Sequence, residues 1–248
     1  MTEKTFIKGL RVLEAMARSA KPTGVAELAA QLKLGNSNVH RLLTTLVDEG
    51  YARRRADMAK YELTMKLWEF RNLPISGIES EELALEDLTR LSQLTNETVY
   101  VSILDGVETV FIHQLESNHA VQARVVSRQP AYASATGKAI LAFQDVHVIE
   151  QVAATLKKLT PMTVDSKARL LEELAEIRER GYATNIGEAR EDVNGVAAPI
   201  RNSVGGVVSA VGVSGPANRL TINKLEEISD DVVGVGEALS YKLGYRPA

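Results

Sequence analysis

Residues 35–51 read GNSNVHRLLTTLVDEGY, and this stretch decides the fold of the N-terminal third of the chain. Its apolar residues recur at helical spacing and predict a helix to about Glu49 whose buried stripe consists of Val39, Leu42, Leu43 and Leu46. Gly35 suits a tight break with positive φ, and Asn36 or Ser37 can cap the helix. The other face has few acids and therefore suits DNA; its expected contact residues are Ser37, Asn38, His40, Arg41, Thr44 and Thr45.

Two further helices are predicted before this stretch, and the second of them is short. The first runs from Thr5 to Ser19 and stops before the breaker at residues 20–22; its expected apolar face consists of Phe6, Leu10, Leu13 and Ala17. The second begins at Thr23 or Gly24 and ends near Lys33, with Glu27 placed as a capping-box acid. Its expected apolar face consists of Val25, Leu28, Ala29 and Leu32.

A basic β-hairpin is predicted after Gly50, with strands 51–55 and 60–63 around a turn at residues 56–59. It carries Arg53, Arg54, Arg55 and Lys60. Helix, helix, glycine turn, helix and basic hairpin is the order of a winged helix-turn-helix, whose recognition helix enters the major groove while the wing contacts phosphates. We therefore assign residues 1–63 to a DNA-binding domain. The alternative is a protein-interaction module with solvated arginines.

The helix-turn-helix motif does not by itself say which residues of the recognition helix contact bases. Asn38 and Arg41 are the candidates for reading base edges. The alternative is that both are ordinary polar residues of an exposed helix.

Length and charge support two domains with different partners. The chain has 248 residues, which at about 100 to 200 residues per domain favours two modest domains. Residues 1–72 hold 13 Lys and Arg against 8 Asp and Glu, and the remainder holds 16 against 24. Such asymmetry suggests that one domain meets a polyanion and the other does not, although it also arises by chance.

Composition excludes several classes of protein. With 45% hydrophobic and 25% charged residues the chain is of the soluble globular type, and no apolar run approaches the roughly 20 residues of a membrane span. The N-terminus is unlike a signal peptide, so we expect a cytoplasmic protein that contacts no membrane. Cysteine is absent and the four histidines show no metal-ligand spacing, so no metal or other cofactor is expected.

The remainder of the chain predicts a hinge and an α+β domain. Residues 64–78 form a linker, with a helix from Thr64 to Leu73 that carries Leu67, Trp68 and Phe70 and is broken by Pro74. In residues 79–248 we expect helices at 79–94, 134–142, 166–180 and 221–243, and strands at 97–104, 107–116, 120–127, 195–201 and 207–214. Antiparallel strands flanked by helices describe a curved sheet that can hold a small ligand.

No enzymatic constellation is found in this domain. Gly137-Lys138 resembles a P-loop, but Tyr132 and Ala139 stand where Gly and Ser or Thr would be needed. Ser214 lacks the second glycine of a nucleophile elbow, and no histidine can be nominated as its base. Ser134-Ala135-Thr136-Gly137 opens a helix, where backbone N–H groups favour an anion; the alternative is that small residues let the helix pack closely on the sheet.

Several motifs in order along nearly the whole chain resemble the IclR-type bacterial transcription regulators. These motifs are NVHRLLTTL at 38–46 with Gly50-Tyr51, ASATGKAILA at 133–142, Arg180-Gly181-Tyr182, Gly187-Glu188, GVAAP at 195–199 and VSGP at 213–216. The resemblance implies a winged helix joined by a helical linker to a GAF-like effector domain, assembled as dimers or tetramers. It further implies control of a catabolic gene cluster through a roughly palindromic operator in double-stranded DNA.

The resemblance also implies where the effector binds. The expected site residues are Val121, Ala135, Thr136, Asn185, Gly195, Gly212 and Ser214, with the ligand carboxylate on the backbone amides of Ala135 and Thr136. Asn38 stands where the family usually has Thr in the recognition helix. Asn185 and Gly212 also depart from the usual family residues, which favours a roomier or less polar pocket for a larger, aromatic acid. Two alternatives remain, a small-molecule enzyme with a GAF-like domain and a protein-interaction module that does not bind DNA.

Overall fold

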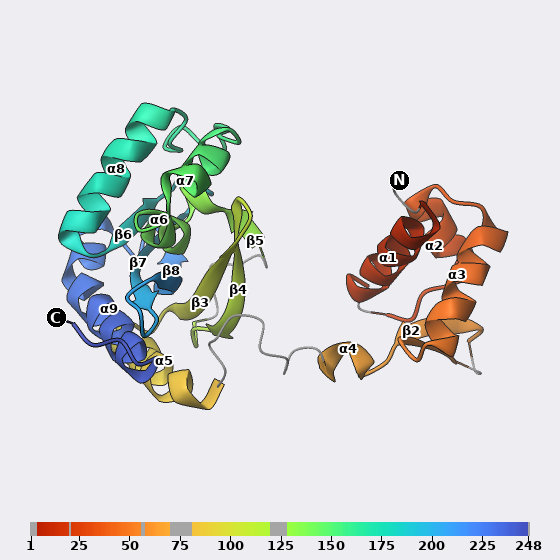
Figure 1. Cartoon of the computed structure of the whole chain (residues 1–248). Helices are drawn as coiled ribbons and strands as arrows, with labels where there is room; N and C mark the ends of the chain where they lie inside the picture. The colour runs from red at the N-terminus through yellow and green to blue at the C-terminus, as the bar shows by residue number, and fades with distance from the viewer. Residues whose placement is uncertain (1–3, 20, 56–57, 70–80, 120–127, 248) are drawn as a thin grey trace. The chain divides into compact units, whose positions relative to one another are not determined.

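The computed structural model describes residues 4–19, 21–55, 58–69, 81–119 and 128–247 (Figure 1). Contacts divide the chain into two compact units, residues 1–75 and 76–248. We call them the DNA unit and the effector unit, and each is described by itself.

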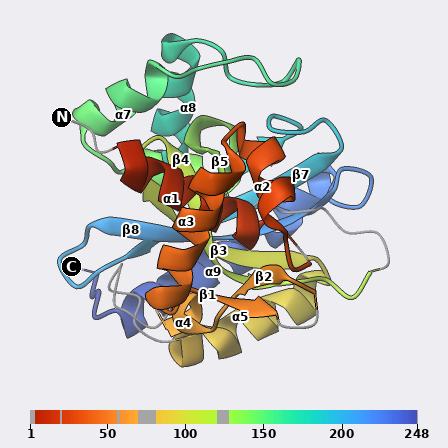
Figure 2. The ribbon, with the colours of Figure 1, turned by 90° about the vertical axis from the view of Figure 1, so that its right-hand side faces the viewer.

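The DNA unit contains the elements expected from the sequence, in the expected order (Figure 2). They are α1 (Lys4–Ala17), α2 (Val25–Leu32), α3 (Asn36–Asp48), β1 (Ala52–Arg55), β2 (Lys60–Leu63) and α4 (Lys66–Glu69). The strands β1 and β2 form an antiparallel hairpin. The core includes the fully buried Val12, Leu28, Val39 and Leu43, so α1, α2 and α3 pack on one another. Phe70 and the rest of the predicted linker helix lie outside the described residues.

The predicted apolar face of α1 is wrong. Phe6 is 65% exposed and Leu10 43% exposed, whereas Val12, Ala15 and Met16 are buried. The reason is tertiary packing, because the stripe with Val12, Ala15 and Met16 faces the core that α1 shares with α2 and α3. Phe6 and Leu10 therefore remain on the surface of the DNA unit.

The predicted break between α2 and α3 is correct in place but wrong in detail. Lys33 has the positive φ of 53°, while Gly35 has a φ of −71° and is itself the N-cap of α3. The reason is the end of α2, where Leu34 N–H donates to Ala29 O and forces the preceding residue into the left-handed region. The capping acid of α2 is confirmed, since Glu27 Oε2 accepts a hydrogen bond of 2.9 Å from Gly24 N–H.

The effector unit is built on a six-stranded antiparallel sheet in the order β5-β4-β3-β8-β7-β6. The strands are β3 (Thr98–Asp105), β4 (Glu108–Leu115), β5 (Arg128–Pro130), β6 (Ala183–Ile186), β7 (Val193–Arg201) and β8 (Val207–Pro216). Gly106 has a positive φ in the β3–β4 turn and Gly205 in the β7–β8 turn, as the turn signals in the sequence predict. The predicted strand 120–127 lies outside the described residues.

Helices cover both faces of this sheet (Figure 1). One face packs on α5 (Glu81–Thr95) and α9 (Ile222–Lys242), and the other on α6 (Ala135–Leu141), α7 (Val146–Ala153) and α8 (Lys167–Arg180). A short 3-10 helix, Ala131–Ala133, precedes α6. The predicted helix start at Ser134 is confirmed, since Ser134 is the N-cap of α6, and Gly181 ends α8 in the left-handed conformation.

The simple alternation expected for β3 is incomplete. Val99 and Val101 are buried, but Tyr100 and Ser102 on the other face are buried as well. Both sides of this central strand are covered, so its polar residues are enclosed rather than solvated. The elements β5, α7 and β6 were not expected from the sequence. No helix in the described ranges is both long and apolar enough to cross a bilayer.

Candidate functional site

The outward face of α3 has the polar character predicted for a recognition helix. Exposed side chains on it are Ser37, His40, Arg41, Thr44 and Thr45, and Asn38 is half-buried. Thr44 Oγ1 donates to His40 O and Thr45 Oγ1 donates to Arg41 O, so both threonine hydroxyls are oriented by the helix itself. Asp48 at the end of α3 is the first acid on the helix. The face therefore offers donors and a cation to an anionic groove.

The four basic residues of the hairpin differ in their surroundings. Arg53 Nε lies 2.6 Å from Glu62 Oε1, and Lys60 Nζ lies 2.9 Å from Glu27 Oε1. Arg55 also contacts Glu62, at 3.6 Å. Arg54 is exposed and forms no ion pair with any described residue. Arg54 is therefore the wing cation with the least internal compensation.

Glu27 links the wing to the turn before α2. The Gly24 N–H and then the Lys60 ammonium hold the pKa of its carboxyl below the usual value. The same carboxylate thus caps α2 and positions a wing lysine.

In the effector unit, the sheet face beneath α6 brings the predicted effector residues together. One row of directly opposed residues across β3, β8, β7 and β6 consists of Thr98, Ser214, Gly195 and Asn185. The next row on the same face consists of Tyr100, Gly212, Ala197 and Ala183. Gly195 therefore separates Asn185 from Ser214, with no side chain between them.

Helix α6 packs directly on the second row. A Cβ at Gly212 would lie 2.9 Å from Thr136 Cγ2, 3.2 Å from Ala197 Cβ and 3.2 Å from Tyr100 Cζ. The side chain that Gly212 lacks therefore leaves no empty space, and the expectation of extra room at this position is wrong. The space is filled because α6 sits closer to the sheet than a larger residue would permit.

Two hydroxyls are buried under α6. Thr136 Oγ1 makes no hydrogen bond within the described part of the chain, and the Ser214 hydroxyl faces the Tyr100 phenol. Tyr100 is buried beside them, and the loss of solvation raises the pKa of its phenol, while the Ser214 hydroxyl opposes this shift. These groups are neutral donors, so they can bind an anion without a second charge.

Tyr100 was missed by the sequence reasoning. Its signal is a polar aromatic residue between Val99 and Val101 in a buried strand. Ala135 and Asn185 are buried near the start of α6 and on β6, as the expected site requires. Val121 lies outside the described residues.

The start of α6 is fixed by Ser134. Its Oγ accepts from Gly137 N–H at 3.0 Å and contacts Thr109 Oγ1 at 3.2 Å. A Cβ at Gly137 would collide with the Ala131 carbonyl, so only glycine permits this entry into the helix. The small residues of the motif thus serve close packing, as the alternative reading of the motif proposed.

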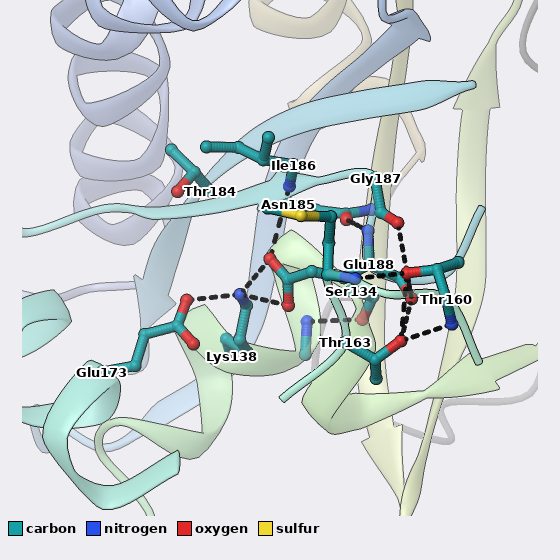
Figure 3. Close-up of polar contacts among 12 residues, drawn as sticks. Ser134, Lys138, Thr160, Thr163, Glu173, Thr184, Asn185, Ile186, Gly187 and Glu188 are labelled. Carbon is teal, nitrogen blue, oxygen red and sulfur yellow. Dashed lines mark hydrogen bonds and ion pairs between the residues drawn. The ribbon is translucent and has the colours of Figure 1, made fainter. Parts of the chain in front are cut away.

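A buried ion cluster holds the other side of α6 (Figure 3). Lys138 is fully buried, and its Nζ lies 2.7 Å from both carboxylate oxygens of Glu188 and 2.5 Å from Glu173 Oε1. Burial raises the pKa of Glu188, Lys138 opposes the shift and Glu173 adds to it. The cluster joins α6 to α8 and to the turn after β6.

Hydrogen bonds from two threonine hydroxyls also hold the turn after β6. Thr160 Oγ1 donates to Gly187 O and Thr163 Oγ1 donates to Glu188 O, each at 2.7 Å (Figure 3). Asn185 Oδ1 accepts from Glu188 N–H at 2.9 Å, which leaves the Asn185 amide NH₂ as the donor end. Asn185 is therefore oriented by the same turn that binds Lys138.

These features define a class of protein: a winged helix-turn-helix unit joined to a unit with a buried polar site is a ligand-responsive DNA-binding transcriptional regulator. Two family models match, the IclR helix-turn-helix domain over residues 6–56 and the C-terminal domain of the bacterial transcriptional regulator IclR over residues 75–241. The chain belongs to the IclR family of transcriptional regulators.

Individual relatives agree with this assignment. The HTH-type transcriptional regulator XynR of Escherichia coli is 31% identical over 96% of this chain and 96% of its own, and KdgR of the same organism is 29% identical over 97% and 93%. The solved IclR of Thermotoga maritima has a TM-score of 0.80, with 30% identity, over 97% of this chain and 99% of that one. An IclR homologue from Microbacterium hydrocarbonoxydans, solved with 4-hydroxybenzoate, has a TM-score of 0.84 and 26% identity over the same shares.

We predict that Lys138→Met lowers the free energy of unfolding by about 3 to 5 kcal/mol, because the buried Glu188 and the half-buried Glu173 then lose their cation. The matched control is Lys167→Met, whose exposed ion pair with Glu150 is worth about 0 to 1 kcal/mol. Urea denaturation of both variants measures the difference. Equal losses in the two variants would contradict a structural role for the cluster.

Proposed function

We propose that this regulator lays α3 in the major groove of a roughly palindromic operator and the β1–β2 wing on the adjacent phosphates. The acid-poor outward face of α3 carries the proposal, supported by the uncompensated charge of Arg54. Asn38 and Arg41 are the proposed base readers, with Ser37, His40, Thr44 and Thr45 around them. Because the family is bacterial, we place this activity in the cytoplasm, where the chromosome lies.

We further propose that a small organic acid from a catabolic pathway binds under α6 and changes the affinity for DNA. The Thr136 hydroxyl, which has no partner among the described residues, and the Ser214 and Tyr100 hydroxyls beside it support this proposal, because a buried hydroxyl without a protein partner favours a ligand that supplies one. The Asn185 amide and the backbone amides of Ala135 and Thr136 complete the proposed anion site. The solved relative that holds 4-hydroxybenzoate supports an aromatic acid as the ligand class.

Self-association is part of the proposal. The exposed apolar stripe of α1, which includes Phe6 and Leu10, is the kind of surface that a second copy covers. The linker residues Leu67, Trp68 and Phe70 are proposed to extend this contact, because a short helix is marginal on its own. A two-fold dimer would present two recognition helices to two half-sites.

We predict that Arg54→Ala weakens binding to all duplexes and flattens the slope of log K against log salt by about one, as expected for one lost phosphate contact. Arg41→Ala should instead lose about 1 to 3 kcal/mol of preference for the operator over random DNA. Electrophoretic mobility shifts with the DNA upstream of the gene measure both effects, and exposed Arg169→Ala on α8 is the control. Unchanged affinity and slope in both variants would refute the DNA interface.

We predict that Ser214→Ala weakens binding of 4-hydroxybenzoate by about tenfold or more, since a hydrogen bond to a charged group is worth roughly 1.5 to 3 kcal/mol. Ser209→Ala is the matched control, because Ser209 is a buried hydroxyl on the same strand and faces the other side of the sheet. Calorimetry measures the affinities, and ligand-free DNA binding should stay constant. Equal affinity in the two variants would move the site elsewhere.

We predict that wild-type protein is at least dimeric at micromolar concentration and that Phe6→Ser with Leu10→Ser shifts it toward monomer. Leu171→Ser is the control, because Leu171 is an exposed leucine of the effector unit. Light scattering gives the masses. A wild-type monomer whose mass does not change on adding operator DNA would refute the proposed assembly.

A further inference from the structure

A second cleft opens in the effector unit, away from the proposed effector residues. Its volume is about 580 Å³, within the range of roughly 300 to 1,000 Å³ that small-molecule sites occupy. Ala198 and Pro199 of β7 and one side of α9 contribute apolar surface, and aromatic rings come from Phe143, Tyr241 and Tyr245. None of the residues proposed for the effector site lines it.

Two arginines of this cleft are held in place by neutral partners. The Arg201 guanidinium lies over the Phe143 ring at 4.4 Å and near the Tyr245 ring at 5.8 Å, and its Nη1 donates to Gly205 O. Arg178 Nη1 donates to Ala142 O at 2.8 Å. Within the described ranges, neither guanidinium forms an ion pair with a carboxylate.

The charge of the lining favours an anion with a single charge. Glu237 also lines the cleft and offsets one of the two arginines, so one positive formal charge remains. Both guanidiniums are anchored at Ala142 and Phe143, directly after α6, which fixes their remaining N–H donors beside the cleft.

Gly234 of α9 lines the cleft without a side chain. Gly234 lies inside the helix, where glycine is less favourable than alanine, yet a Cβ there would meet no atom within 4 Å. Gly236, two residues later, is explained by packing, because its Cβ would lie 2.9 Å from Pro199 O. Packing on the sheet therefore requires Gly236, whereas the open space beside Gly234 would accept a side chain.

We propose that this cleft is a second ligand site, for a small organic monoanion with a flat apolar body. Arg178 and Arg201 would bind the anionic group, the rings of Phe143, Tyr241 and Tyr245 would contact the body, and Gly234 would leave room for it. The site is independent of the proposed effector site. Phe143, which lines the cleft, follows the last residue of α6 by two positions, and the start of α6 carries Ala135 and Thr136.

The test is titration of the full-length chain with 2-naphthoate, a flat aromatic monoanion, by calorimetry. Gly234→Leu should weaken binding by tenfold or more, because the new side chain fills the cleft, and Arg178→Gln by about fivefold. Asp231→Leu is the matched control, since it adds the same side chain to an exposed position of α9 outside the cleft. The thermal midpoint of Gly234→Leu should not fall, because leucine favours the helix.

The other possible results of these titrations either support or overturn the second site. Wild-type affinity in Gly234→Leu, or no binding by the wild type, would overturn the proposal. Ser214→Ala should keep the binding that Gly234→Leu loses; loss of all binding in Ser214→Ala instead would place the probe in the proposed effector site and overturn the second site. Light scattering also shows whether Gly234→Leu changes the mass of the assembly. If the mass changes but the affinity for 2-naphthoate does not, the cleft is an interface between copies of the chain, and the proposal is overturned.

Discussion

The close approach of α6 to the sheet is the constraint on which the effector unit depends. Gly212 admits the Thr136 methyl group, and Gly137 admits the Ala131 carbonyl, so both contacts require the absence of a side chain. Because protein interiors are close-packed, one added methyl group at either contact has to displace a helix or a strand. The same approach places the Thr136 hydroxyl over the strands that carry Ser214 and Tyr100.

The buried Lys138 connects α6 to two other segments of the effector unit. Lys138 points from α6 to Glu188 and Glu173, which lie on a turn and on α8. A buried ion pair contributes little net stability compared with apolar packing, but it penalises every arrangement that separates the charges. The turn that carries Glu188 also orients Asn185, so charge pairing and the proposed ligand contact share one segment. In a regulator, this arrangement couples the geometry of the proposed anion site to α8 as well as to α6.

The DNA unit uses charge differently, because its ion pairs are exposed. Arg53 and Lys60 are partly neutralised by Glu62 and Glu27, whereas Arg54 has no such partner among the described residues. Exposed pairs exchange readily for phosphate, so the carboxylates tune the charge of the wing and do not cancel it. The effector unit instead provides neutral hydroxyls at its proposed anion site.

The sequence by itself determined the order of elements in the DNA unit, the start of α6 at Ser134 and the outward face of α3, because helical period, capping and glycine turns are local properties. Family motifs also located the proposed effector residues. Only the tertiary structure decided that Phe6 faces outward on α1, that Arg54 differs from its neighbours, and that Lys138 meets Glu188. These depend on contacts between segments far apart in the chain, such as the 50 residues between Lys138 and Glu188, and local periodicity does not encode such distances.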